Sequence, residues 1–462
     1  MPIRICIIVD NPLRDLDGLV LVAWHLAKMN FHVYLVPMYA QISDVKAISP
    51  DFILANYVRA NNVDTLKRFK ALGIKIGVLD TEGVSGKNTD EFAKLVKKGM
   101  RDDIVDLYCL WGNNQYQSFT KYNVLPKHKI KVTGCPRYDF CNKSLVQALP
   151  SISDIDNYVL INTNFPTANP RFTRSSEDEI SAMIKVGFGE DFAKQFVHDA
   201  KITYKNVIKV VRIIAKKNPS QNFVIRPHPF ENIDAYSELL GIKNIFIRQE
   251  GTSLEWINSS ICLIHLNCST SIEAAMLGKE ALSLEWLNTP ALSVPMAGLV
   301  SRKMNSERQL HSTISSIIKK ISLDVNIDMR GNKRSIVNSL YAGNDGKSAE
   351  RVAEEIFNVV TNKSSPNYKS KIKPISDKAA IIFSLQVILG YKAYTLVRNI
   401  FKSQSQINLK SGKSYSRKGV DNVLKRINIA YNDFSVKSTV PEKIDIKYNR
   451  LFSGKSIKIF LK

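Results

Sequence analysis

The sequence predicts an α/β protein made of two units, each built around a parallel sheet, with a basic extension at the C-terminal end. Short apolar runs alternate with amphipathic stretches, which is the order of elements in a parallel sheet crossed by helices. The chain has 462 residues, more than one ordinary hydrophobic core holds. Several apolar runs end in polar residues, and open α/β sheets bind ligands at the carboxyl ends of their strands.

The first unit is expected over residues 1–145. Its apolar runs are short and continuous, as strands buried on both faces are. Helical patterns separate them at Leu16–Met29, Val63–Leu72 and Thr89–Lys98. The expected strands are Ile3–Val9, His32–Pro37, Phe52–Ala55, Ile74–Leu79, Leu107–Leu110 and Ile130–Thr133.

The second unit is expected over residues 158–360, after a crossover that contains Pro150. A long helical pattern, Phe192–Lys217, precedes its second strand, and helical patterns around Glu307–Ile321 and Ala349–Val360 are expected to close the unit. The expected strands are Tyr158–Thr163, Asn222–Arg226, Asn244–Ile247, Ile261–Ile264 and Ala281–Leu284.

The rest of the chain divides into a Ser/Pro/Lys-rich linker, residues 361–377, and a basic amphipathic tail, residues 378–462. The stretch Lys378–Lys402 contains apolar runs shorter than the ~20 residues that span a bilayer. It suits a helix lying in a membrane interface, or a helix packed on its own protein. The remainder of the tail has weak periodicity, and no structure is predicted for it.

The charge of the chain predicts an anionic partner. The net charge is +23, and from residue 401 onward fourteen Lys/Arg face four Asp/Glu. Because no nucleic-acid-binding motif is present, no nucleic acid is expected, and an anionic membrane surface or glycan is favoured. The N-terminus begins with a strand and lacks the pattern of a signal peptide. The six cysteines lack metal-ligand spacing, so we expect a reduced, cytoplasmic protein, peripheral on the inner face of the cytoplasmic membrane.

The first candidate site is Arg226-Pro227-His228-Pro229, directly after an expected strand. The two prolines restrict the backbone on both sides of His228, so its imidazole has a defined direction. Such an imidazole can donate to a phosphate oxygen or act as a general acid, and Arg226 could contact the same anion. The alternative is a purely structural turn.

The second candidate site is the start of a helix at Ser269, Thr270, Ser271 and Glu273. Hydroxyls and free backbone N–H groups at a helix start can bind an anion. Thr270 and Glu273 also have the spacing of a capping box, which needs no ligand. Glu273 could instead accept hydrogen bonds from ribose hydroxyls.

The third candidate site is the turn Asp80-Thr81-Glu82-Gly83, at the end of another expected strand. Asp80 or Glu82 could act as a base toward an acceptor hydroxyl, or as a nucleophile. The alternative is an ordinary loop that caps the next helix.

Other strand ends also carry candidate residues. Arg137 follows a strand and could contact an acidic substrate, or form an ion pair with Asp139 or another neighbour. Asn164 follows the first strand of the second unit and could meet phosphate or sugar.

These motifs together resemble bacterial surface-carbohydrate biosynthesis proteins, namely GT-B-type glycosyltransferases related to the Kdo transferases of capsule and lipopolysaccharide and to bacterial sialyltransferases. The matching motifs are Glu82-Gly83 with Asp80 upstream, His228-Pro229, and Ser269-Thr270-Ser271, in that order. The segments Trp111-Gly112 and 134–139 also look like this family. The resemblance covers about residues 1–300.

The resemblance implies two Rossmann-type domains facing a cleft and the transfer of an acidic sugar from a CMP-sugar donor. Glu82 or Asp80 would be the acceptor-side carboxylate, and His228 would bind or protonate the departing phosphate. The donor would lie beside Ser269–Ser271, and the acceptor would be a glycan or glycolipid. No cofactor and no metal are implied, because His and helix N–H groups can neutralise a single phosphate.

Two alternatives stay open. One is a polyol-phosphate transferase with a CDP-alditol donor, which moves a phosphate rather than a sugar. The other is a non-catalytic scaffold of a capsule assembly complex, bound through the basic tail.

Overall fold

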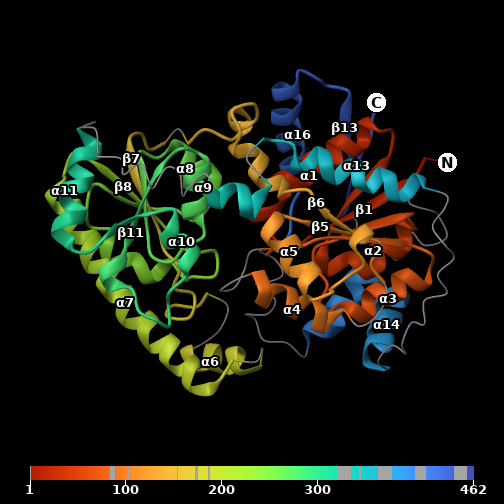
Figure 1. Ribbon diagram of the computed structural model, residues 1–462, viewed down its shortest axis with the longest axis horizontal. Coiled ribbons are helices and arrows are strands. Elements are labelled where there is room, and N and C mark those ends of the chain that lie inside the picture. The colour runs from red at the N-terminus through yellow and green to blue at the C-terminus, as the bar shows by residue number, and fades with distance from the viewer. Residues whose placement is uncertain are drawn as a thin grey trace. The chain divides into compact units, whose positions relative to one another are not determined.

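The structure is a computed structural model and divides into two compact units (Figure 1). Unit 1 joins Met1–Ala148 with Asn338–Lys462, and unit 2 is the continuous stretch Leu149–Val337. The described residues are 2–83, 89–100, 104–152, 154–171, 175–185, 188–319, 335–342, 345–362, 377–400, 413–441 and 455–462.

Within the described residues, unit 1 is built around an eight-stranded sheet with the order β13-β14-β2-β1-β3-β4-β5-β6. The strands from β2 to β6 pair in parallel, while β14 pairs antiparallel with β2 and with β13. Their bounds are β1 (Arg4–Val9), β2 (His32–Pro37), β3 (Phe52–Ala55), β4 (Lys75–Leu79), β5 (Leu107–Leu110), β6 (Ile130–Val132), β13 (Val436–Thr439) and β14 (Ile457–Leu461).

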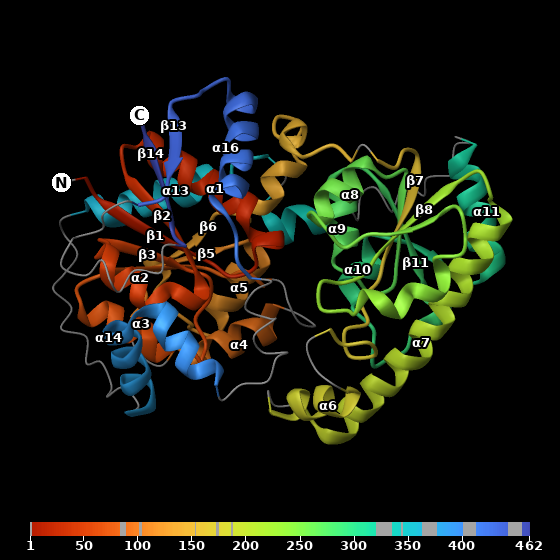
Figure 2. The same ribbon diagram turned by 180° about the vertical axis from the view of Figure 1, so that it is seen from behind.

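Helices cover both faces of this sheet. Figures 1 and 2 show α1, α13 and α16 on one side and α2, α3 and α14 on the other. The helices are α1 (Pro12–Lys28), α2 (Gln41–Ile48), α3 (Val63–Ala71), α4 (Thr89–Gly99), α5 (Asn113–Lys121), α13 (Ser348–Thr361), α14 (Asp377–Asn399) and α16 (Arg417–Tyr431). Short 3-10 turns are η1 (Met38–Ala40), η2 (Lys127–Lys129), η3 (Pro136–Cys141) and η4 (Val146–Ala148).

Unit 2 contains, in its described part, a six-stranded parallel sheet with the order β12-β11-β10-β7-β8-β9. The strands are β7 (Tyr158–Asn162), β8 (Asn222–Arg226), β9 (Ile245–Ile247), β10 (Cys262–His265), β11 (Glu280–Leu284) and β12 (Arg302–Met304). The helices and 3-10 turns are α6 (Ser176–Lys185), α7 (Glu190–Lys217), η5 (Ile233–Leu239), α8 (Ser253–Ser259), α9 (Thr270–Met276), η6 (Glu285–Leu287), α10 (Pro295–Leu299) and α11 (Glu307–Ile318).

The central strand β7 explains why these runs are apolar throughout. Val159 and Ile161 belong to the buried cluster that contains α7, whereas Tyr158 and Leu160 belong to the cluster that contains α8. Successive side chains of a strand point to opposite faces, so a sheet covered on both faces needs an apolar residue at every position.

This architecture confirms the predicted α/β fold class with two Rossmann-type parallel sheets. Every expected strand is present, and its ends fall within one residue of the expected ones. The short strand β12 is not among the expected strands. It has three residues and only Met304 is buried, so it lacks a continuous apolar run.

Helix α13 differs from the expectation that Ala349–Val360 closes the second unit, since it belongs to unit 1. The buried carboxylate of Asp139 accepts hydrogen bonds from the backbone N–H groups of Ser348 at 2.9 Å and Ala349 at 2.7 Å. These bonds satisfy N–H groups at the start of α13 and fasten it to the first half of the chain.

The tail also differs from the sequence expectation, because parts of it are regular structure within unit 1. Ile459 of β14 pairs with Val33, and Ser456 donates to the buried carboxylate of Asp44 at 2.6 Å. Most of the expected linker 361–377 lies outside the described residues. Among the described helices, none has both the length and the apolar character needed to cross a bilayer.

Candidate functional site

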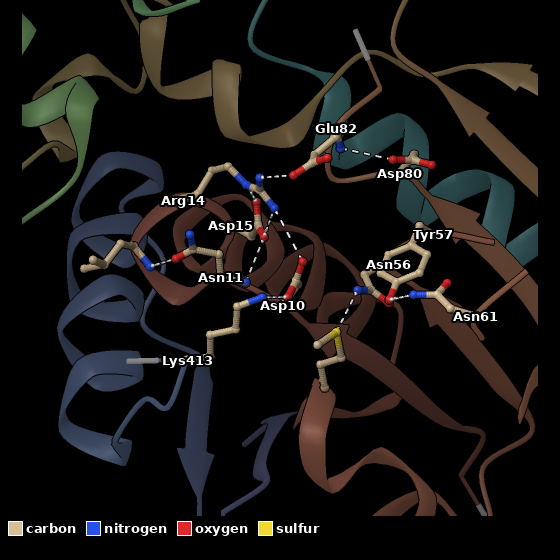
Figure 3. A network of polar contacts seen from close by, with 12 residues as sticks. Asp10, Asn11, Arg14, Asp15, Asn56, Tyr57, Asn61, Asp80, Glu82 and Lys413 are labelled. Atoms are coloured by element: carbon tan, nitrogen blue, oxygen red, sulfur yellow. Dashed lines mark hydrogen bonds and ion pairs between the residues drawn. The ribbon is translucent and has the colours of Figure 1, made fainter. Parts of the chain in front are cut away.

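The carboxyl edge of the unit 1 sheet holds a group of charged side chains (Figure 3). Asp10 directly follows β1, and Arg14 and Asp15 lie in the first turn of α1. The Arg14 guanidinium contacts Asp15 at 2.7 Å and Glu82 at 3.2 Å. Lys413, from the C-terminal part of the chain, contacts Asp10 at 2.7 Å. Neither Arg14 nor Lys413 was singled out in the sequence, because neither lies in a motif and Lys413 is 403 residues from its partner.

The two predicted carboxylates, Asp80 and Glu82, have different environments. The Asp80 side chain is 3% exposed and contacts Arg59 at 2.8 Å and the Tyr108 hydroxyl at 3.2 Å. Its other oxygen accepts from the backbone N–H of Glu82 at 3.0 Å. Burial raises the pKa of Asp80, and the Arg59 charge works in the opposite direction. Asp80 therefore shapes the turn, whereas the Glu82 side chain is 62% exposed and held by Arg14.

A pocket lies beside this turn, entirely within unit 1. The empty volume of the pocket is about 420 Å³, including the part that is open to solvent. Asp15, Asn56, Asp80, Trp111 and Arg137 supply polar or aromatic groups to its wall. Helix α1 packs closely against the segment that contains Arg137, because a Cβ on Gly18 would lie only 2.6 Å from the backbone nitrogen of Arg137.

Arg137 lies among aromatic side chains at the pocket. Its guanidinium donates to the hydroxyl of Tyr138 and lies 5.8 Å from the centre of the Trp111 ring. Asp139, the expected partner, instead binds the start of α13, and burial raises the pKa of this carboxyl to about 6. Arg137 thus lines the pocket beside an aromatic ring.

In unit 2, two residues at the end of β7 link the two predicted motifs. Asn162 donates to the hydroxyl of Thr270 at 3.0 Å. The next residue, Thr163, donates to Glu231 at 2.9 Å, and Glu231 also accepts from the backbone N–H of His228 at 3.0 Å. Since β7 lies between β8 and β10, its end holds the His228 loop on one side and the Thr270 loop on the other.

The His228 ring has a defined tautomer. Its Nδ1 accepts from the backbone N–H of Phe230 at 3.2 Å, so the proton of the neutral ring is on Nε2. The loop is also held by Gln249, whose amide donates to the carbonyl of His228 at 2.8 Å. An imidazole arranged in this way presents an N–H donor.

Glu231, which the sequence analysis missed, organises this loop. It is fully buried and accepts from Tyr236 and Thr163 as well as from the His228 backbone. Burial raises the pKa of the Glu231 carboxyl, while its hydrogen bonds lower it. Glu231 lies three residues after His228, and this closeness to the His228-Pro229 motif is the only signal in the sequence that could have identified it.

The Ser269–Glu273 segment separates into accessible and buried side chains. Ser269 is exposed and Thr270 half-buried, whereas Ser271 is buried and donates to the carbonyl of Ala297 at 3.3 Å. Thr270 is not the N-cap that a capping box requires, because it is the first residue of α9 and Ser269 holds the N-cap position. Thr270 bonds Asn162 and Cys268, and Glu273 accepts from Ser253 at 2.6 Å. Only Ser269 and Thr270 are therefore placed to meet a ligand.

Arg226 ends β8 and is a buried cation. It donates to the carbonyl of Gly251 at 2.5 Å, and burial lowers its pKa while Glu273 raises it. In the part of the chain that the structure describes, Arg226 Nε and Asn162 Oδ1 are buried with no hydrogen-bond partner. Buried polar atoms without a partner are uncommon, and a bound water or ion, a catalytic role or strain accounts for them. Asn164 is exposed and lies two residues after the end of β7.

The predicted site residues thus fall into two sets. Asp80, Glu82 and Arg137 belong to unit 1, and Asn164, Arg226, His228 and the 269–273 segment belong to unit 2. Among the described residues, no group of three or more His, Cys, Asp or Glu side chains is arranged to hold a metal ion.

No family model and no curated protein matches the chain. Among solved structures, it is similar to the wall teichoic acid polymerase TagF, with 11% identity over 77% of this chain and 89% of that one and a TM-score of 0.49. It is also similar to S. aureus MnaA in a co-structure with UDP, with 12% identity, 78% and 98% coverage and a TM-score of 0.48. The UDP-GlcNAc 2-epimerase of Methanocaldococcus jannaschii gives 12% identity, 77% and 99% coverage and a TM-score of 0.48. Similarities of this size carry no conclusion about activity.

Proposed function

We propose that the protein is a metal-independent glycosyltransferase that moves an acidic sugar, Kdo or another nonulosonate, from a CMP-sugar donor to a bacterial surface polysaccharide or lipopolysaccharide. Unit 2 holds the nucleotide in this proposal, and unit 1 provides the acceptor side. The ordered set of motifs at Glu82-Gly83, His228-Pro229 and Ser269-Thr270-Ser271 supports the class of donor.

The observation that carries the proposal is the geometry around His228. The ring offers Nε2–H because Nδ1 accepts from Phe230, and the end of β7 ties its loop to Thr270. A phosphate that leaves with CMP gains negative charge, and preorganised donors stabilise that charge. Protonation at Nδ1 would break the bond from Phe230, so the geometry favours His228 as a hydrogen-bond donor to the phosphate over a general acid.

On the acceptor side, Glu82 is the candidate base. Its carboxylate is exposed and oriented by Arg14, whereas Asp80 is enclosed by Arg59 and Tyr108. Arg137, beside Trp111, would bind a carboxylate of the substrate. A glycan or glycolipid acceptor at the inner face of the cytoplasmic membrane would fit the net charge of +23.

A donor comparison tests the proposal. Purified protein is incubated with an acceptor extract and CMP-Kdo, CMP-sialic acid or CDP-glycerol. Transfer from either CMP-sugar supports the proposal, transfer from CDP-glycerol alone would replace it with polyol-phosphate transfer, and no turnover would favour a scaffold. His228→Ala should lower the transfer rate by roughly 10²–10⁴-fold without unfolding the protein.

Nucleotide binding by unit 2 has a separate test. CMP should raise the melting temperature of the wild-type protein, and much less that of Ser269→Ala/Thr270→Ala, because only these two side chains of the segment are accessible. Ser312→Ala, an exposed change on α11, serves as the control. Equal stabilisation of the wild type and the double variant would contradict this assignment.

A further inference from the structure

Helix α14 carries an outward row of large apolar side chains. Ile381, Leu385, Ile388, Leu389, Leu396 and Val397 are between 40% and 71% exposed, and Ile400, which follows the helix, is 77% exposed. In the first arm of the helix they recur at the spacing of one helical face. Single exposed apolar residues are ordinary, but a contiguous row marks a surface that binds something.

The opposite face of α14 is already occupied by unit 1. Phe383 packs on the buried cluster that covers the sheet, and its ring centre lies 6.0 Å from that of Phe69 in α3. Gln386 and Tyr394 are buried as well. The helix is therefore held in place by one face, and the outward row is a second apolar face of a docked helix.

The backbone of α14 turns at Gly390. This residue has φ 72° and ψ 162°, outside the helical region, and glycine adopts such a conformation without steric cost. The helix therefore consists of two arms, Asp377–Leu389 and Tyr391–Asn399, which suit contact with a surface along their length.

The charge around this row identifies the kind of surface. Lys378 and Arg398 are exposed near the two ends of the helix. In the sequence from residue 363 to residue 410, nine Lys/Arg accompany a single acid, Asp377. A second protein copy would bring the same positive charge and be repelled, whereas an anionic bilayer offers both an apolar interior and negative head groups.

We infer that the outward row of α14 inserts into the surface of an anionic phospholipid bilayer, with Lys378 and Arg398 on the head groups. The inference deepens the proposed function, since it names the surface by which the enzyme would reach a membrane-linked acceptor. Binding should weaken with salt, because part of the attraction is electrostatic.

The test is flotation of the full-length protein with vesicles of phosphatidylcholine alone or mixed with phosphatidylglycerol. The variant Leu385→Glu/Ile388→Glu changes two exposed positions of the row, so the fold should persist, which its melting temperature checks. The matched control Leu72→Glu/Leu95→Glu changes two exposed leucines elsewhere in unit 1. Wild type and control should float with the anionic vesicles at low salt, and the α14 variant should bind at least about tenfold more weakly.

Equal flotation of the α14 variant and the wild type would overturn the inference. So would absence of wild-type flotation, or a wild-type dimer in light scattering that the α14 variant abolishes, since a second copy would then cover the row. Transfer to a soluble acceptor separates the two proposals. The α14 variant should keep wild-type turnover with this acceptor. No turnover by any of the proteins would contradict the proposed enzymatic function but not the proposed membrane-binding surface.

Discussion

Asp80 and Glu82 are two residues apart, but Asp80 is buried and Glu82 is exposed. Asp80 is enclosed by Arg59 and Tyr108 and receives the N–H of Glu82, so its carboxylate holds the turn in shape. Glu82 is exposed on that turn beside Arg14. In the proposed reaction, the buried Asp80 would position the base Glu82 without contacting the substrate itself.

Substitution of the two carboxylates should therefore affect different quantities. Asp80→Asn removes the buried partner of the half-buried Arg59 and should lower the free energy of unfolding by about 3 kcal/mol. Glu82→Gln should change that free energy by less than about 0.5 kcal/mol but lower the transfer rate by about 10²-fold or more. Chemical denaturation and turnover measure the two effects, and the reverse pattern would assign catalysis to Asp80.

His265 is a buried residue whose protonation should link stability to pH. It lies at the end of β10, where Nε2 contacts the Ser301 hydroxyl at 2.8 Å and Nδ1 accepts from the N–H of Cys268 at 3.4 Å. Burial lowers the pKa of His265 from 6.5 to about 4. Below pH 6.5 the unfolded chain takes up a proton that the folded protein refuses until about pH 4, so the stabilisation is full above 6.5 and lost as the pH falls through this window.

Denaturation at several pH values checks this linkage. Between about pH 7 and pH 5 the wild type should lose roughly 2 kcal/mol more than His265→Gln, which cannot titrate there. The variant is less stable at neutral pH, so the comparison uses the slope with pH and not the absolute value. Parallel slopes for the two proteins would show that His265 has the same pKa in the folded and the unfolded state, which would contradict the linkage.

At the scale of elements, β14 turns the end of the chain into part of the unit 1 core. Ile459 is fully buried and pairs with Val33 of β2, while Ser456 donates to the buried Asp44. A strand that adds to the edge of a sheet satisfies the backbone groups of that edge and covers apolar side chains. Removal of the whole tail would therefore damage unit 1, and point changes on α14 are the sounder test of membrane binding.

Truncation of one β14 side chain should reveal this role. Ile459→Ala should lower the free energy of unfolding by about 2–5 kcal/mol, the range for a large buried aliphatic residue. Lys462→Ala, an exposed change at the end of the chain, should alter it by less than about 0.5 kcal/mol. Equal values for both variants, measured by urea denaturation, would mean that the strand is not part of the cooperative fold.

At the scale of the whole molecule, the two units differ in how the chain builds them. Unit 2 is the single stretch Leu149–Val337, while unit 1 needs both ends of the chain. Trp24 of α1 donates to Asn428 of α16 at 2.9 Å, across 404 residues. The two units should therefore respond differently when they are expressed apart.

We expect residues 149–337 alone to unfold cooperatively and to bind CMP with an affinity close to that of the full chain. Residues 1–148 alone should not give a stable fold, because α13, α16, β13 and β14 are missing from the faces and edge of their sheet. Calorimetry and hydrogen exchange measure both. A stable 1–148 fragment would show that the C-terminal elements are not required for the fold of unit 1.

Much of the fold could be predicted from the sequence because buried parallel strands are continuous apolar runs. Most strands from β1 to β11 have this character, whereas β6 and β9 bury only their first residue. The residues that follow the strands are candidate ligand contacts because of their place alone. The predicted site residues lie at these strand ends, since a motif such as Arg226-Pro227-His228-Pro229 is local and survives without knowledge of its neighbours.

The sequence by itself determined the two parallel sheets, the order of their strands along the chain and the local motifs, since each depends on residues close together in the chain. Only the tertiary structure decided that α13 and the tail join unit 1, that Lys413 reaches Asp10, and that Glu82 rather than Asp80 is accessible. These features depend on pairing between distant segments and on which side chain a neighbour covers. Local periodicity cannot predict either feature, because the partner residue lies far away in the sequence, outside the short segment that forms the pattern.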